Sequence, residues 1–151
     1  MENCWRSLVF FLWGDRMAEI VDLKILIEKF GKVGRVKKYD YESKEVTAFL
    51  QKFFTEVKKD LTNFKGQTPA AVMKWNEIQE LALLARTDIN TWEEYVNDYK
   101  DSKQGVEVHA VGTAKECIVR FLRKLGNENK PNFIYDKDNK TLYIVLKDIK
   151  L

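Results

Sequence analysis

The chain has 151 residues, of which 45% are hydrophobic and 13% aromatic, so it is long enough for one buried core, and this composition argues against a disordered chain. The formal net charge of +3 is too small to argue for a nucleic-acid partner by itself. One histidine and two isolated cysteines, Cys4 and Cys117, come close to excluding a structural zinc site, which needs four ligands. We therefore predict no metal and no other cofactor.

Residues 1–16 form an apolar N-terminal extension ahead of a predicted single globular domain, 17–151. The apolar run at 8–13 is shorter than the hydrophobic part of a signal peptide and much shorter than the roughly 20 residues that span a bilayer. Because the cysteine usage also fits a reducing compartment, we expect a cytoplasmic protein with no membrane partner. The extension is either a start-site extension, since Met17 directly precedes a helix start, or a surface that contacts a second subunit.

The first part of the domain, 17–101, has the apolar spacing of four helices. Hydrophobic side chains recur every three or four residues in four segments: 18–30, 42–64, 69–85 and 91–100. Ser43 or Asp40 is expected to cap the second helix, and Thr91 the fourth. Thr68 followed by Pro69 predicts the start of the third helix, because the first turn tolerates a residue without an N–H.

The C-terminal part, 102–151, is predicted to form a β-α-β-β unit. The alternating, β-branched segment 106–111 predicts a short strand. A basic helix over 113–125 is expected to follow, with Thr113 as its N-cap and Gly126 at its end.

A β-hairpin is predicted to complete the fold. Its arms are 133–135 and 141–146, and Asp136, Asp138 and Asn139 supply turn chemistry between them. The second arm is apolar at every position after its first, which indicates burial on both faces or a face offered to a partner. The predicted fold class is therefore α+β and mainly helical, with about five helices and a small C-terminal antiparallel sheet or hairpin.

The order of these elements resembles the winged helix-turn-helix plan, in which two strands follow a recognition helix and their connecting wing touches the DNA backbone. The resemblance covers about residues 90–147 and rests on four elements: helix 91–100, strand 106–111, basic helix 113–125 and hairpin 133–146. The connection between the two helices is long and strand-like instead of a tight turn, and the wing is short. A unit in which three strands pack on the basic helix fits the same segments.

The predicted basic helix is the first candidate for nucleic-acid contacts. Four of its bases lie opposite its apolar stripe: Lys115, Arg120, Arg123 and Lys124. Such a face could neutralise phosphates, and the resemblance implies that it belongs to a recognition helix, with Lys137 and Lys140 at the wing tip. The alternative is a solvated face that keeps the helix soluble.

A second basic cluster lies in a predicted loop ahead of two tyrosines. It consists of Lys32, Arg35, Lys37 and Lys38. Its flanking glycines and the adjacent Tyr39 and Tyr41 suit a contact that follows a nucleic-acid backbone and stacks bases. An ordinary basic connection between helices explains the same residues.

The leading functional prediction is a non-enzymatic DNA- or RNA-binding protein, namely a small dimeric DNA-binding regulator that uses the basic helix and the wing. The alternative is a protein-interaction or assembly module that does not bind nucleic acid and forms a homodimer through the apolar N-terminus or the hairpin edge. A small metal-dependent hydrolase or nuclease is third, because Asp136 and Asp138 straddle a turn. Turn chemistry explains these carboxylates equally, and His109 has no evident catalytic partner, so we predict no catalytic residue.

Overall fold

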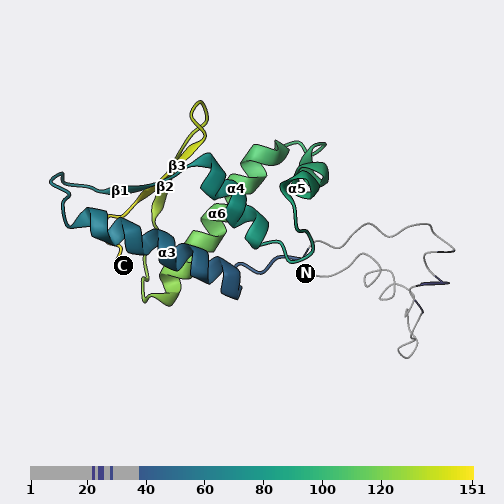
Figure 1. Cartoon of the computed structure of the whole chain (residues 1–151), viewed down its shortest axis with the longest axis horizontal. Coiled ribbons are helices and arrows are strands. Elements are labelled where there is room, and N and C mark those ends of the chain that lie inside the picture. Colours follow the sequence, from purple (N-terminus) through teal and green to yellow (C-terminus); the bar gives the residue numbers. More distant parts are fainter. Residues whose placement is uncertain (1–21, 23, 26–27, 29–37) are drawn as a thin grey trace, which may run out of the picture. The chain divides into compact units, whose positions relative to one another are not determined.

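The computed structural model covers the whole chain and describes residues 22, 24, 25, 28 and 38–151 (Figure 1). The chain divides into two compact units, Met1–Lys38 and Tyr39–Leu151. In the first unit, Lys24, Ile25 and Glu28 are helical and exposed, within the predicted helix 18–30. The predicted extension 1–16 lies outside the described residues.

The second unit is α+β, as predicted. Its elements in chain order are α3 (Lys44–Leu61), β1 (Ala70–Met73), α4 (Trp75–Leu84), α5 (Trp92–Tyr99), α6 (Gly105–Lys124), β2 (Asn132–Asp136) and β3 (Thr141–Val145). Residues 38–151 thus contain four helices instead of about five, together with a small antiparallel sheet. Most of the remaining predicted helix, 18–30, lies outside the described residues. None of the described helices has both the length and the apolar character needed to cross a bilayer.

Local capping signals identify several helix ends correctly. Ser43 caps α3, because its Oγ accepts a hydrogen bond from the Val46 N–H at 3.2 Å. Thr91 caps α5 in the same way, with the Glu94 N–H as donor at 3.2 Å. Gly126 follows α6 at a φ of +98°, a left-handed conformation that glycine adopts without steric cost.

The predicted strand at 106–111 is wrong, because these residues form the first half of α6. Ala110 and Ala114 are fully buried at helical spacing, so packing against the neighbouring helices outweighs the strand preference of Val106, Val108 and Val111. Thr113, predicted as an N-cap, is buried inside the helix, where its hydroxyl donates to the His109 carbonyl at 3.0 Å. The predicted basic helix 113–125 is therefore the C-terminal half of a longer helix.

The predicted helix start at Thr68 and Pro69 is also wrong. Residues 70–73 form β1, which pairs antiparallel with β3, and α4 begins only after Lys74. The Lys74 N–H donates to the Glu77 carboxylate at 3.0 Å and so caps the helix from its own first turn. The third strand of the sheet therefore comes from between α3 and α4, and the predicted β-α-β-β unit is not formed.

The sheet has the strand order β1-β3-β2, which explains why the second hairpin arm is apolar throughout. β3 is the central strand, and its Leu142 and Ile144 are fully buried on the side that faces the helices. In the register, Ile144 lies between Ala71 of β1 and Phe133 of β2. Because α6 also packs against α3, α4 and α5, the core lies around this helix.

A buried guanidinium joins the parts of the chain that precede α6. The side chain of Arg86, directly after α4, is 0% exposed and donates at 2.7 Å to both Asp88 and Asp98. It also donates to the Tyr99 hydroxyl at 2.9 Å, and that hydroxyl bonds to the hydroxyl of Tyr39. Burial alone would lower the pKa of Arg86, but hydrogen bonds with the two carboxylates raise it above its usual value. The guanidinium is thus charged and fully paired.

We expect Arg86→Met to destabilise the fold by about 3–5 kcal/mol, because it leaves the carboxylates of Asp88 and Asp98 without their buried partner. Urea unfolding followed by circular dichroism measures the change. The control is Lys100→Met, which removes an exposed positive charge beside α5 and should cost much less. Equal losses in the two variants would mean that the Arg86 pairs contribute no more than a surface charge.

Cys117 is a free, fully buried cysteine, and burial raises the pKa of its thiol to about 12. Because only the thiolate reacts, we expect iodoacetamide to modify Cys117 slowly in the folded protein at pH 8 and rapidly in urea. A Cys4→Ser variant leaves Cys117 as the sole thiol for this measurement by mass spectrometry. Rapid labelling without urea would contradict the burial of this side chain.

Candidate nucleic-acid interface

One side of α6 is accessible over much of its length, except at Val119, which lies on the same side and is buried. Successive helical residues turn by about 100°, which places Val108, Gly112, Lys115 and Arg123 within a sector of about 80°. These four residues are exposed or half-buried, whereas Ala114 on the opposite side is fully buried. Packing in the core thus determines which residues of α6 are accessible to solvent.

Lys115 is held where α6 meets the first residues of β2. Its ammonium lies 5.7 Å from the centre of the Phe133 ring, a cation–π contact that aligns the side chain with the groove between the two elements. This groove has a volume of about 410 Å³ and is also lined by Glu116 and Lys130. Two lysines and one carboxylate thus line this groove.

Arg120 and Lys124 converge on one carboxylate that precedes α3. Glu42 lies 3.1 Å from each of these cations, and Arg120 also pairs with Glu116 at 2.9 Å. Hydrogen bonds from Lys124 and Arg120 lower the pKa of the Glu42 carboxyl. All of these side chains are 41–50% exposed, so the pairs add little stability and another anion can replace Glu42.

A second groove runs along the other flank of the exposed side of α6. It has a volume of about 600 Å³ and is lined by Tyr39, Tyr41, His109, Glu116 and Arg120, among others. The rings of Tyr39 and Tyr41 are stacked, with centres 5.5 Å apart, and the Arg120 guanidinium lies 5.3 Å from the centre of the Tyr41 ring. The structure therefore brings the tyrosines beside the second predicted cluster together with a base of the first.

Of the second predicted cluster itself, only Lys38 is described, and it is exposed. Lys32, Arg35 and Lys37 lie outside the described residues.

The hairpin turn is anchored to the beginning of α6. Glu107 accepts a hydrogen bond from the Tyr135 hydroxyl at 2.8 Å, and its carboxylate lies 3.9 Å from the Lys140 ammonium. Lys140, at a φ of +48°, is the left-handed residue of the turn, and its ammonium also lies 5.1 Å from the centre of the Trp75 ring. Lys137 is exposed at the turn. The turn projects beyond the helices (Figure 1).

Asp136, which the sequence suggested for catalysis, and His109 form hydrogen bonds with different sets of residues. Asp136 accepts hydrogen bonds from the side chain and backbone of Asn139 and from the Asp138 N–H, and these bonds lower its pKa. His109 instead lies 3.0 Å from the Tyr95 hydroxyl through Nδ1 and stacks on the Tyr99 ring, with centres 3.6 Å apart. Within the described residues, no group of three or more His, Cys, Asp or Glu side chains is arranged to hold a metal ion.

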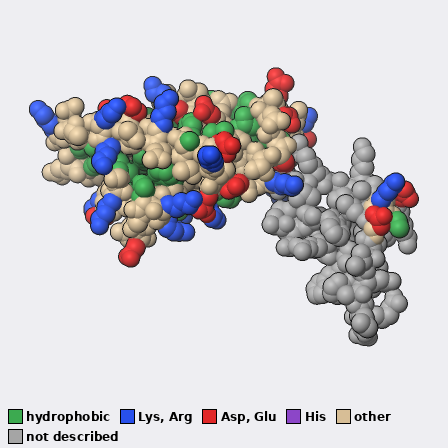
Figure 2. Space-filling model, turned by 60° about the horizontal axis from the view of Figure 1, so that its bottom comes forward, with side chains coloured by type: hydrophobic (Ala, Val, Ile, Leu, Met, Phe, Trp, Pro, Cys, Tyr) green, Lys and Arg blue, Asp and Glu red, His purple; other side chains and the backbone are tan. Residues whose placement is uncertain are grey.

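Acidic partners of the basic residues are the main feature that sequence reasoning missed. The pairing of Glu116 with Arg120 was readable, because residues four apart lie side by side on a helix. Glu42 lies 78 positions from Arg120, and no local signal connects them. Figure 2 accordingly shows Lys and Arg side chains interspersed with Asp and Glu over the described surface in that view.

Two surfaces were predicted to form a homodimer, the apolar N-terminus and the hairpin edge. The apolar extension 1–16 lies outside the described residues. Of the two hairpin strands, β3 pairs on both sides, so only β2 forms an edge of the sheet. Its Ile134 is 60% exposed.

Comparison of the chain with models of protein families, with curated protein sequences and with solved structures found no match. The functional argument therefore depends on the residues and their geometry.

Proposed function

We propose that this protein binds nucleic acid through the exposed side of α6 and the turn between β2 and β3, and that it acts by binding and not as an enzyme. The observation that carries the proposal is the groove in which the stacked rings of Tyr39 and Tyr41 adjoin the Arg120 guanidinium. Aromatic faces stack on bases, and neighbouring cations contact phosphates. Lys115 and Arg123 extend the positive charge along the same side of the helix.

The element order of α5, α6 and the hairpin supports a winged-helix-like mode of binding. The connection from α5 to α6 consists only of residues 100–104, because 106–111 belong to α6. Gly105 follows it at a φ of +82°, and helix-turn-helix connections are short and often contain glycine. The connection between the two helices is therefore shorter than the sequence predicts and closer to the winged-helix plan, whereas the wing, residues 137–140, is still short.

The spacing of the cations fits a nucleic-acid backbone better than a compact pocket. Lys140 lies beside Glu107 in the first turn of α6, and Lys124 is its last residue, which separates them by about 25 Å along the helix. This distance equals the rise of about seven base pairs. The N-terminal half of the exposed side presents Val108 and Gly112 and no cation, so we expect backbone contacts with little sequence preference.

The exposed cations provide the direct test. We expect Lys115→Ala with Arg123→Ala to weaken binding and to reduce the slope of log K against log salt by about two, one for each lost phosphate contact. The measurement is fluorescence anisotropy with labelled duplex DNA, single-stranded DNA and RNA between about 50 and 200 mM salt. Comparison of the probes shows whether stacking on unpaired bases or the duplex backbone dominates.

The matched control is Lys58→Ala with Lys65→Ala, which removes two exposed charges elsewhere and should leave the slope almost unchanged. If no probe binds at low salt, or if both double variants change the slope equally, the protein does not bind nucleic acid through this surface.

Glu42 provides a test in the opposite direction. Glu42→Gln releases Arg120 and Lys124 from their shared carboxylate, so we expect binding to become about fivefold tighter, as for one surface ion pair. Glu93→Gln is the control, because it removes one exposed acid on α5 and changes the net charge equally. Equal effects of the two variants in the same anisotropy assay would show that only the overall charge matters.

A further inference from the structure

The outer edge of β1 has no partner strand among the described residues. β1 is one of the two edge strands of the sheet, and the Leu146 N–H donates to the Pro69 carbonyl at 3.0 Å. Hydrogen bonding alternates along an antiparallel ladder, so the N–H and C=O groups of Ala70 and Val72 point away from β3. The strand carries no charged residue and no proline within its bounds, the features that commonly protect an edge from pairing.

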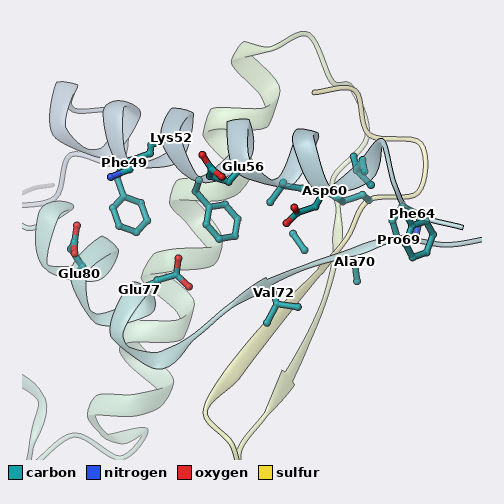
Figure 3. Close-up of a pocket in the computed structure, with 15 residues that line it drawn as sticks. Phe49, Lys52, Glu56, Asp60, Phe64, Pro69, Ala70, Val72, Glu77 and Glu80 are labelled. Carbon is teal, nitrogen blue, oxygen red and sulfur yellow. The ribbon is translucent and has the colours of Figure 1, made fainter. Parts of the chain in front are cut away.

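This open edge borders a groove of about 540 Å³ between α3 and β1 (Figure 3). Four consecutive residues, 69–72, line it, although neighbouring side chains of a strand point to opposite faces. The groove therefore meets β1 along its edge. Across from β1, a stripe of α3 at four-residue spacing supplies an apolar wall: Phe49, Phe53, Val57 and Leu61.

The charged residues of the groove are mainly acidic. Carboxylates from two helices line it, Glu56 and Asp60 from α3 and Glu77 and Glu80 from α4, whereas Lys52 is its one basic residue among those described. Figure 3 shows the Phe49 ring and the carboxylates of Asp60 and Glu77 facing the space between α3 and β1. The groove thus combines an apolar wall, an acidic rim and unpaired backbone groups.

We propose that β1 accepts an extended segment of a partner protein, which carries both apolar residues and Lys or Arg, as an added strand. The main-chain groups of Ala70 and Val72 would pair with the added strand, its apolar side chains would enter the groove, and its cations would face the carboxylates. The apolar stripe of α3 is about 18 Å long, which matches about five residues of extended chain. This surface is separate from the exposed side of α6, so the proposal does not depend on nucleic-acid binding.

Random linear peptides displayed on phage and selected against the full-length chain test the chemistry of the partner. We expect the selected peptides to combine apolar residues with Lys or Arg. Their synthetic forms should bind about tenfold more weakly to Glu56→Lys with Asp60→Lys. The control, Glu45→Lys with Glu93→Lys, reverses two exposed acids outside the groove and should bind as the unmodified chain does. Selection of no peptide, or of peptides without basic residues, would overturn the proposal.

Val72→Pro tests the pairing itself. Proline removes the outward N–H of Val72 and leaves the pairing of β1 with β3 intact, so peptide binding should fall about tenfold while the unfolding midpoint stays unchanged. Hydrogen exchange of the unmodified chain gives a second measurement, because the Ala70 and Val72 amides should become protected only in the complex. If these amides stay unprotected, or if Val72→Pro instead abolishes self-association of the chain, the edge does not accept a partner segment in this way.

Discussion

The buried guanidinium of Arg86 is the interaction on which the arrangement of the helices around α6 depends. A charge removed from water is tolerated only when carboxylates and hydrogen-bond acceptors surround it. Asp88 in the following loop and Asp98 on α5 meet this requirement, so the end of α4 and the whole of α5 must come together at one place. The same guanidinium donates to Tyr99, whose hydroxyl bonds to Tyr39. This contact fixes the segment that precedes α3.

The candidate site follows from this arrangement. Tyr39 stacks on Tyr41, and Tyr99 stacks on His109 of α6. Because Arg86 donates to Tyr99, whose hydroxyl bonds to Tyr39, the aromatic residues that line the groove beside α6 are connected to the buried guanidinium. Arg120, which lines this groove, lies at the surface and is paired with the exposed carboxylates of Glu42 and Glu116. A rigid aromatic groove with exchangeable ion pairs around it suits an anionic polymer, because the rings are already in position and the carboxylates can be replaced by phosphates.

The two proposed surfaces differ in chemistry because different elements build them. The exposed side of α6 carries two of the four Lys and Arg residues of the helix and adjoins stacked tyrosines. The β1 edge instead adjoins an acidic rim from α3 and α4. The mild net charge of the chain conceals this difference, since the 26 basic and 23 acidic residues nearly balance over the whole chain. A protein with both surfaces could hold a nucleic acid and a basic partner segment at the same time.

The sequence by itself determined the features that depend on neighbouring residues. The caps at Ser43 and Thr91, the glycine after α6 and the hairpin turn all rest on contacts within a few positions, so their residue types are sufficient evidence. The spacing of the basic residues also predicted that they lie on one helix, opposite its apolar stripe. Only the tertiary structure decided whether 70–73 and 106–111 were helix or strand, because both segments are short and their residue patterns suit either. β3 needed a second neighbour, which made 70–73 a strand, whereas 106–111 belong to α6, which packs against three helices and buries Ala110 and Val111. The pairing of Glu42 with Arg120 and Lys124 was hidden for the same reason, since no local pattern connects residues that meet only after folding.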